Sequence, residues 1–303
     1  MEMKRRDFMG AALAAGIAAT TGSVNAQDAP APARRGGGRG AAGAQTGAGR
    51  GAPPPKTSVA KVERLWNIPS FKNMNALEAT PEGLWIGDQV SEKVCRVDWE
   101  TGKILYEVQT ESHNMSGLSV GGGYLWAGSN GSVNNRRPPR PTDREYGEYS
   151  QLDMKTGKIV KLYRPPWGGG AHGVTYHQET GKLWVAALDL QAVAEMDPKD
   201  NLRILRMFHT PGQRQHGLDI DKDTLYVLYA TDREVHKFDI SNPNAGARLL
   251  EVIQIPKTEP DQHGLALHNG YLYYCDSGLT DPGPGSMPGE VCRFKLNTAA
   301  ATN

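Results

Sequence analysis

A short pattern of residues recurs five times along this chain, and it constrains the fold more than any other feature of the sequence. Each copy has a polar residue, a small residue and then Leu or Val, and a turn separates these three from a Leu-Trp or Leu-Tyr pair. The copies begin with Asn75-Ala76-Leu77, Ser116-Gly117-Leu118, His172-Gly173-Val174, His216-Gly217-Leu218 and His263-Gly264-Leu265. Their first residues are 41, 56, 44 and 47 positions apart. A period of about 40–50 residues is typical of folds built from repeated units.

Each repeat has room for four short strands. The pattern supplies the first two, and a third apolar segment with an acidic end follows, as in Val94–Asp98 and Val235–Asp239. A turn such as Glu100–Lys103 then leads to a fourth strand. The long second spacing is explained by an insertion rich in Arg and Pro, which runs from Asn134 to about Glu148. No segment shows the periodicity of an amphipathic helix.

Four strands in a unit of this length are typical of a β-propeller blade. We therefore predict an all-β fold, a single β-propeller of five blades, with six blades or a two-sheet sandwich as the alternatives. The last repeat stops after its third strand, Glu290–Leu296, and one segment, Val59–Ile68, precedes the first repeat. We expect Val59–Ile68 to pair with Cys292–Leu296, because the two halves complete the last blade and remove an exposed sheet edge.

Aromatic residues and cysteines are expected in the core. Recurrence of Trp or Tyr at one place in every repeat favours packing between blades over stacking on a ligand. These residues are Trp85, Trp126, Trp184, Tyr226 and Tyr273. Three cysteines are too few for a disulfide framework in a chain of this length. We interpret Cys95, Cys275 and Cys292 as small apolar residues of packed strands, with a Cys275–Cys292 bridge as the alternative.

Residues 1–26 are predicted to be an export signal. Arg5-Arg6-Asp7-Phe8 precedes an apolar run of small residues that ends at about Thr20, and Val24-Asn25-Ala26 offers a cleavage site. Paired arginines at this place are typical of the twin-arginine route, and a general secretory signal is the alternative. The sequence therefore predicts a periplasmic or extracellular protein whose mature form has no transmembrane segment.

The rest of the chain divides by composition. Residues 27–57 consist mostly of Ala, Gly, Pro, Gln and Arg, and we expect a disordered linker there. The propeller domain is expected at residues 58–297 and a short tail at residues 298–303. Residues 1–57 hold eight of the 34 Lys and Arg residues and three of the 33 Asp and Glu residues, which leaves 26 basic and 30 acidic residues elsewhere. This balance argues against nucleic acid as a partner.

Histidine occupies the first position of the pattern in three consecutive repeats. In a propeller this position begins the innermost strand of each blade, so His172, His216 and His263 are expected to meet at one rim of the central tunnel. Imidazole is a ligand for zinc, copper, iron and nickel, so a divalent or transition metal ion is the predicted cofactor. The predicted metal ligands are His113, His172, His216 and His263. The alternative is that the histidines are inherited residues of the strand start without chemistry.

The other histidines and the neighbours of the rim complete the predicted assignment. His177, His209, His236 and His268 are interpreted as surface residues. Side chains that would bind a ligand or orient the imidazoles are Asn75, Ser116, Gln215, Asp261 and Gln262. The predicted catalytic residues are His216 and His263, which would move protons, and Arg214, which would stabilise negative charge.

The three His-Gly-Leu or His-Gly-Val segments, each followed by Leu-Trp or Leu-Tyr, resemble the virginiamycin B lyase-like propellers. They are also similar to the wider group of NHL-repeat and gluconolactonase-type propellers, and the resemblance covers residues 58–297. The streptogramin lyase opens an ester by elimination with magnesium, His and Glu, but it has seven blades, for which this chain is too short. Gluconolactonase-type enzymes hold a divalent ion with Glu, Asn and Asp, and Glu78, Asn75 and Asp219 stand in similar places.

Two functions follow as hypotheses. The first is an exported metal-dependent lyase or hydrolase, expected as a monomer, that acts on a small ester, lactone or sugar-like substrate at the rim. The second is a non-catalytic binding module of the cell envelope, in which the loops Asn134–Tyr149 and Ser277–Glu290 recognise a partner.

Overall fold

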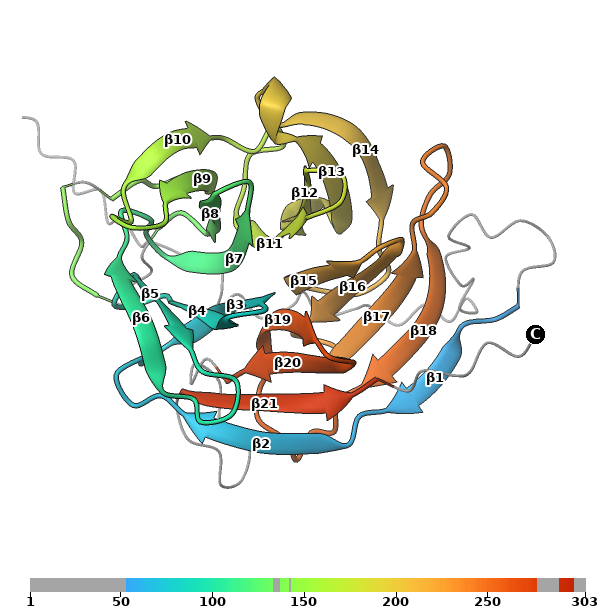
Figure 1. Ribbon diagram of the computed structural model, residues 1–303. Helices are drawn as coiled ribbons and strands as arrows, with labels where there is room; N and C mark the ends of the chain where they lie inside the picture. The colour runs from blue at the N-terminus through green and yellow to red at the C-terminus, as the bar shows by residue number, and fades with distance from the viewer. Residues whose placement is uncertain (1–52, 133–136, 142, 277–288, 297–303) are drawn as a thin grey trace, which may run out of the picture. The chain divides into compact units, whose positions relative to one another are not determined.

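Each repeat of the sequence forms one antiparallel sheet, and the sheets stand side by side around a common axis (Figure 1). The computed structural model describes residues 53–132, 137–141, 143–276 and 289–296. These residues belong to one compact unit, Ala42–Asn303, and within them there are five sheets. The prediction of a five-bladed β-propeller is confirmed. The predicted signal peptide and tail, most of the linker and most of the loop Ser277–Glu290 lie outside the described residues.

The blades follow the order of the repeats. Blade 1 contains β3 (Met74–Thr80), β4 (Gly83–Asp88), β5 (Lys93–Val97) and β6 (Ile104–Gln109). Blade 2 contains β7 (Met115–Gly121), β8 (Tyr124–Ser129), β9 (Glu148–Asp153) and β10 (Ile159–Tyr163). Blade 3 contains β11 (Ala171–His177), β12 (Lys182–Ala187), β13 (Ala192–Asp197) and β14 (Arg203–His209), with short 3-10 turns at Leu188–Leu190 and Pro198–Asp200. Blade 4 contains β15 (Gln215–Asp221), β16 (Thr224–Tyr229), β17 (Glu234–Asp239) and β18 (Arg248–Gln254). Blade 5 contains β19 (His263–His268), β20 (Tyr271–Cys275) and β21 (Glu290–Lys295).

The N-terminal segment closes the ring, as predicted, but it does so with two strands. β2 (Val62–Asn67) pairs with β21 and becomes the outer strand of blade 5. The preceding strand, β1 (Lys56–Val59), instead runs parallel to β18 and adds a fifth strand to blade 4. The prediction of one strand over Val59–Ile68 was therefore wrong in extent, because the chain crosses between blades at Ala60. The folded region also starts two residues before the expected Ser58.

The five innermost strands contact one another in a closed ring, and glycine makes this close approach possible (Figure 1). A Cβ atom on Gly117 would lie 2.2 Å from the carbonyl oxygen of His172 in the next blade. A Cβ atom on Gly217 would lie 2.6 Å from the Cβ atom of Leu265. The small second residue of the repeat pattern is thus required by packing between neighbouring blades.

The aliphatic third residue of the pattern fills the axis of the propeller. These side chains are each at most 2% exposed, and they are Leu77, Leu118, Val174, Leu218 and Leu265. The space that they line does not admit a water molecule. The axis is therefore a packed core and not an open channel.

The aromatic and cysteine residues lie in the core, as expected. Trp85, Trp126, Trp184, Tyr226 and Tyr273 are each at most 4% exposed. All three cysteines are buried and free, so the alternative of a Cys275–Cys292 bridge is not realised. The Cys275 thiol donates a hydrogen bond to the carbonyl oxygen of His263, at 3.1 Å.

Two histidines interpreted as surface residues are buried. His177, at the end of β11, is 7% exposed, and its Nδ1 lies 3.0 Å from the Thr180 hydroxyl across a tight turn. His236 is 4% exposed, because it points inward from β17 against the ring of Tyr229. His209 is exposed, and His268 is half-buried.

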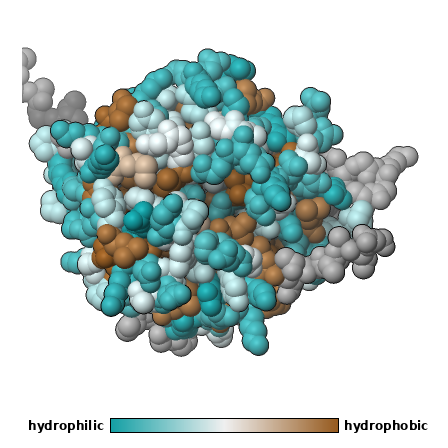
Figure 2. All heavy atoms as spheres, in the orientation of Figure 1, coloured by the Kyte–Doolittle hydropathy of each residue, from teal (hydrophilic) through white to brown (hydrophobic). Residues whose placement is uncertain are grey.

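The outer surface is largely polar. Figure 2 shows a face on which hydrophobic residues form separate small patches among hydrophilic ones. Exposed apolar side chains gather on outer strands, and examples are Leu105 on β6 and Val160 on β10. Scattered residues of this kind are ordinary for a protein surface. Among the described residues, no helix is long and apolar enough to cross a membrane.

Candidate active site at the histidine rim

The first residue of the repeat pattern lies in a β-bulge in four of the five blades. The register of the inner strand shifts across this residue, for example between Gln215 and Gly217 around His216, and between Met115 and Gly117 around Ser116. The shift also covers Asn75 in β3 and His172 in β11, whereas in β19 His263 pairs with Cys275 and the shift lies at Gly264 and Leu265. A bulge redirects the side chain of its extra residue, and bulges are frequent next to active sites. The inner strands therefore share an irregularity at or directly after the rim residue in every blade.

Three imidazole rings from adjacent blades contact one another at this rim. The ring centres of His172 and His216 are 4.6 Å apart, and those of His216 and His263 are 4.3 Å apart. Both contacts are edge to face, with interplanar angles of 90° and 82°. The three residues are at most 2% exposed. The structure thus brings together the three histidines that the repeat pattern singled out.

The three rings are spaced differently from imidazoles that share one metal ion. Imidazoles that share one tetrahedral zinc ion at about 2.0–2.1 Å keep their ring centres roughly 5 Å apart. The rings here lie closer together, and no group of three His, Cys, Asp or Glu side chains in the described part of the chain is arranged to hold a metal ion. The donor atoms suit a transition metal, but as placed the imidazoles contact one another and do not form a metal centre.

His263 stands between a cation and a carboxylate. A guanidinium nitrogen of Arg214 lies 3.5 Å from Nε2 of His263, and Oδ2 of Asp261 lies 3.8 Å from Nδ1. Arginine can only donate, so Nε2 is the accepting nitrogen and Nδ1 carries the proton toward Asp261. This is the tautomer that a general base needs on the Arg214 side. Asp261 is itself fixed by Arg233, whose guanidinium is 3.2 Å from Oδ1.

Arg214 has an unusual backbone and an unusual environment. Its φ angle is 61°, in the left-handed region that costs free energy for a residue with a side chain. Burial lowers the pKa of its guanidinium, and the nearby Asp261 carboxylate opposes this effect. The side chain remains a partly exposed cation at the edge of a buried histidine cluster.

The two glutamines that precede His216 and His263 are anchored by hydrogen bonds. The amide nitrogen of Gln215 donates to the Thr210 hydroxyl at 2.7 Å, and that of Gln262 donates to the Ala230 carbonyl oxygen at 3.2 Å. Both residues are fully buried. These bonds lead away from the imidazoles, so the structure gives the glutamines a positioning role at the rim.

Blades 1 and 2 complete the rim with amides and a hydroxyl. The Asn75 amide donates to Ser116 at 3.2 Å, and the Gln89 amide donates to Ser116 at 3.1 Å and to Asn114 at 2.5 Å. Gln89 and Asn114 were not predicted. In four repeats the residue two places before the first residue of the pattern is polar, as in Asn114 and Arg214. This regularity could have identified Asn114 as a rim residue from the sequence.

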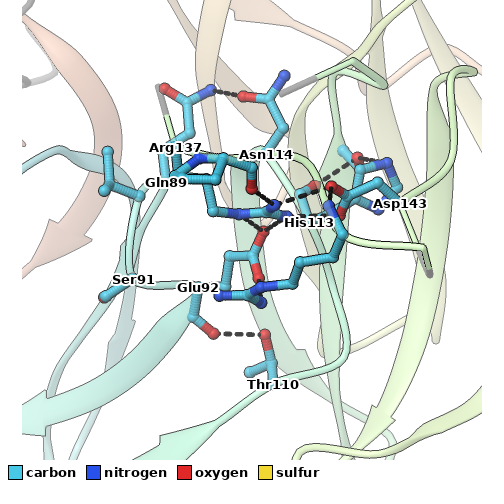
Figure 3. Close-up of polar contacts among 12 residues, drawn as sticks. Gln89, Ser91, Glu92, Thr110, His113, Asn114, Arg137 and Asp143 are labelled. Carbon is cyan, nitrogen blue, oxygen red and sulfur yellow. Dashed lines mark hydrogen bonds and ion pairs between the residues drawn. The ribbon is translucent and has the colours of Figure 1, made fainter. Parts of the chain in front are cut away.

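His113 belongs to a different cluster, so it does not supply a fourth imidazole to the rim. Its Nε2 lies 2.8 Å from the carbonyl oxygen of Arg144, and its Nδ1 lies 3.5 Å from Oε1 of Glu148. Both partners come from the insertion in blade 2 or its border, and Figure 3 labels His113 together with Arg137 and Asp143 of this insertion. Burial lowers the pKa of the His113 imidazole, although the Glu148 carboxylate acts in the opposite direction.

The acidic residues named by the resemblance form a buried pair. Glu78 on β3 and Asp219 on β15 are each 6% exposed. Asp219 accepts hydrogen bonds from the backbone N–H groups of Ile220, at 2.6 Å, and of Leu267. Burial raises the pKa of both carboxyl groups, and the Asp219 charge raises that of Glu78 further. The Asn75 amide donates its hydrogen bond to Ser116.

Comparisons with known proteins identify the fold. No family model matches the sequence, and no curated protein matches it. The structure is similar to glutaminyl cyclase from Myxococcus xanthus, with a TM-score of 0.57 and 13% identity over 80% of this chain and 100% of that one. It is also similar to a catalytically inactive virginiamycin B lyase from Staphylococcus aureus with quinupristin, with a TM-score of 0.47 and 14% identity over 78% and 99% of the two chains. For a luciferin-regenerating enzyme the TM-score is 0.47 and the identity 18%, over 74% and 77%. At 13% identity the likeness to the glutaminyl cyclase is one of fold alone.

Proposed function

We propose that this protein is an enzyme, a lyase or hydrolase that acts on a small ester, lactone or sugar-like substrate at the histidine rim. The observation that carries the proposal is the group of Arg214, His263 and Asp261, in which one imidazole lies between a cation and a carboxylate. The propeller fold supports an enzyme, since a glutaminyl cyclase has the same fold. The substrate class follows from the sequence resemblance.

Arg214, His263 and Asp261 each have a defined role in the proposed reaction. Nε2 of His263 accepts a proton from the substrate or from water, while Asp261 stabilises the imidazolium that forms. The guanidinium of Arg214 stabilises the negative charge that develops on the substrate oxygen. His216, in edge-to-face contact with His263, is the second group that can exchange a proton. Since the imidazoles are buried and Arg214 is partly exposed, the substrate approaches from the Arg214 side.

The test is a substrate panel with matched variants. Wild-type protein is assayed on esters, lactones and sugar derivatives, and every activity found is measured again in His263→Ala, Arg214→Gln and Asp261→Asn. We expect kcat/KM to fall by about 10²–10⁴-fold in His263→Ala and by about 10²-fold or more in Arg214→Gln. His209→Ala, an exposed histidine on β14, is the control and should keep full activity. Equal activity in His263→Ala and His209→Ala would exclude the proposed base.

Metal dependence stays a prediction from the sequence. Elemental analysis of purified wild type, His216→Ala and His268→Ala tests it without any assay of activity. Stoichiometric metal that is lost only in His216→Ala would support a metal at the rim and would require the rings to rotate apart. The same background level in all three proteins would leave the acid–base chemistry to the side chains alone.

The second candidate function is a binding module of the cell envelope. It is favoured by the burial of the three imidazoles, because each of these side chains is at most 2% exposed and a substrate would have little direct access to them. A complete lack of turnover in the substrate panel, together with capture of an envelope component that depends on the insertion, would favour this function. We also propose that the protein is exported and monomeric.

A further inference from the structure

Blade 4 shows how this propeller accepts an additional strand at the outer edge of a blade. β1 runs parallel to β18, and Lys56 stands opposite Glu251 (Figure 1). The Ser58 hydroxyl donates to Oε1 of Glu251 at 2.7 Å, and the Lys56 ammonium lies 3.9 Å from the same oxygen. Backbone pairing at this edge is therefore accompanied by a pair of opposite charges, which stabilises neighbouring strands.

The outer edge of blade 2 has no such strand. β10 ends its sheet, whose strand order is β10-β9-β8-β7, and it lies at the periphery of the propeller (Figure 1). The N–H group of Ile159, at the start of β10, donates to Oε2 of Glu111 at 2.8 Å. Beyond this residue, no described residue forms a hydrogen bond with the outward backbone groups of residues 160–163. A strand edge with unpaired N–H and C=O groups is a template for pairing with another chain.

The edges of β10 and β18 correspond residue by residue. In blade 4, Glu251 is opposite the residue of β17 that pairs with the recurring aromatic residue Tyr226. In blade 2, Lys161 is opposite the residue of β9 that pairs with Trp126. Lys161 therefore occupies the place of Glu251, and the charge at this place is inverted. The residues that follow correspond in the same order, Leu162, Tyr163 and Arg164 to Val252, Ile253 and Gln254.

The Lys161 side chain is available to a partner, whereas its counterparts in blades 1 and 3 are not. In blade 1 the counterpart is Tyr106, whose hydroxyl donates to a backbone carbonyl oxygen at 2.6 Å. In blade 3 it is Arg206, which donates to Glu195 at 2.7 Å. Lys161 is exposed, and its ammonium lies 4.7 Å from the centre of an aromatic ring of the same strand. It forms no ion pair with a carboxylate of the described residues, so blade 2 presents an uncompensated charge at this edge.

The residues around Lys161 carry one sign of charge. Residues 154–164 contain four basic residues and no acidic one, and all four are exposed. They are Lys155, Lys158, Lys161 and Arg164. This strand would repel residues 27–55 of a second copy, which contain four Arg and one Asp. The charges therefore favour an acidic segment from a different protein. Leu162, which is 38% exposed, adds an apolar side chain to the same edge.

We propose that the outer edge of β10 binds an extended acidic segment of a partner protein, which becomes a fifth strand of blade 2. The backbone of the segment pairs with the outward groups of residues 160–163, and side chains give the specificity, as in other cases of strand addition to a sheet edge. In the register of β1, acidic residues of the partner stand beside Lys161 and Arg164, and an apolar residue stands beside Leu162. The site lies outside the rim and does not depend on the reaction proposed there.

Fluorescence anisotropy with the full chain and labelled synthetic peptides tests the proposal. The Glu peptide has Glu-Val-Thr-Glu at its centre, the Lys peptide has Lys in place of both Glu residues, and a third peptide is the Glu peptide with a methylated backbone. We expect the Glu peptide to bind with a Kd below about 1 mM, and backbone methylation to abolish binding, because it removes the N–H groups that pair with the edge.

Charge reversal at the edge provides the matched variants. Lys161→Glu should weaken binding of the Glu peptide about tenfold, because one cross-strand attraction becomes a repulsion. The same variant should gain binding of the Lys peptide. Lys257→Glu, in an exposed loop after β18, is the control and should bind the Glu peptide like wild type. All three proteins should melt at the same temperature, since both lysines are exposed.

The proposal is supported if peptide preference reverses in Lys161→Glu and if the amides of residues 160–163 become protected from hydrogen exchange in the complex. It is overturned if the Glu peptide does not bind, if the methylated peptide binds equally well, or if Lys161→Glu binds the Glu peptide like wild type. Binding of phosphatidylglycerol vesicles without binding of the Glu peptide would overturn it in favour of a lipid surface. Dimerisation that is lost in Lys161→Glu, again without peptide binding, would overturn it in favour of a second copy.

Discussion

Glu78 and Asp219, on the inner strands β3 and β15, form a buried carboxyl pair whose pKa values both lie above their ordinary range. For Asp219 the pKa is raised from 3.8 to about 7, chiefly by burial, and the Asp221 charge adds to the effect. Hydroxyl groups of Ser119 and Thr175 bond to the pair and lower its pKa values in part. The folded protein therefore holds protons that the unfolded chain releases.

The pair makes stability depend on pH with a definite sign. Between about pH 4 and pH 7 the folded state binds more protons than the unfolded state, so the free energy of unfolding falls as pH rises through this window. The loss for Asp219 alone is on the order of 2–4 kcal/mol, since one pKa unit corresponds to about 1.4 kcal/mol. Urea denaturation at pH 4.5, 6 and 8 measures it. Glu78→Gln should flatten the dependence and stabilise the protein at pH 8.

An exposed acid provides the control for this prediction. Glu63→Gln removes a carboxylate on β2 that pairs with Arg293 at the surface, and it should leave the slope unchanged. If Glu78→Gln and Glu63→Gln show the same pH dependence as wild type, the buried pair does not carry the effect.

Much of the fold was predictable from the repeat pattern, because that pattern reflects packing that recurs in every blade. Leu or Val at the third position fills the axis, and the recurring Trp or Tyr, such as Trp184, fills the space between blades. The pairing of β2 with β21 followed from the incomplete last repeat. The meeting of His172, His216 and His263 followed from topology alone, since the inner strands start on one face.

The remaining features depend on contacts that have no counterpart in other repeats. β1 pairs with β18 through a segment, Lys56–Val59, that lacks a clear alternation of apolar and polar residues. His113 is held by Arg144 and Glu148, and the insertion that supplies these contacts occurs in blade 2 only. The register shift at or directly after each rim residue was not predicted either, although the following glycine in four repeats is compatible with it.

Successive deletions from the N-terminus should lower the stability of the propeller in steps. Deleting residues 27–55 should leave thermal stability unchanged, because this segment precedes β1. Deleting through Val59 removes the strand that pairs with β18 and should lower the melting temperature moderately. Deleting through Asn67 also removes β2, which exposes the edge of β21, and should cause aggregation. Thermal melts with light scattering measure all three, and cooperative unfolding of the last deletion at the wild-type temperature would refute closure by β2.

Export by the twin-arginine route is tested in the full chain. Changing Arg5 and Arg6 together to Lys should retain the precursor in the cytoplasm, because this route depends on the arginine pair. Cell fractionation with immunoblotting measures the distribution. The control changes Arg34 and Arg35, in the predicted linker, to Lys and should be exported normally. Efficient export of the Arg5 and Arg6 variant would instead indicate the general secretory route.

Because the inner strands are closely packed, a side chain added at their glycines should destabilise the protein. Gly117→Ala should destabilise the protein by about 2–4 kcal/mol, because the new Cβ atom would lie 2.2 Å from the His172 carbonyl oxygen and force blades 2 and 3 apart. Gly246→Ala is the matched control, since no atom lies within 4 Å of its added Cβ atom, and it should change stability by less than about 0.5 kcal/mol. Urea denaturation measures both. Because His172 belongs to the rim, Gly117→Ala should also lower any rim activity at temperatures where the protein remains folded. Equal stability of the two variants would show that the inner strands can separate without cost, and the packing explanation for the small second residue of the repeat pattern would then fail.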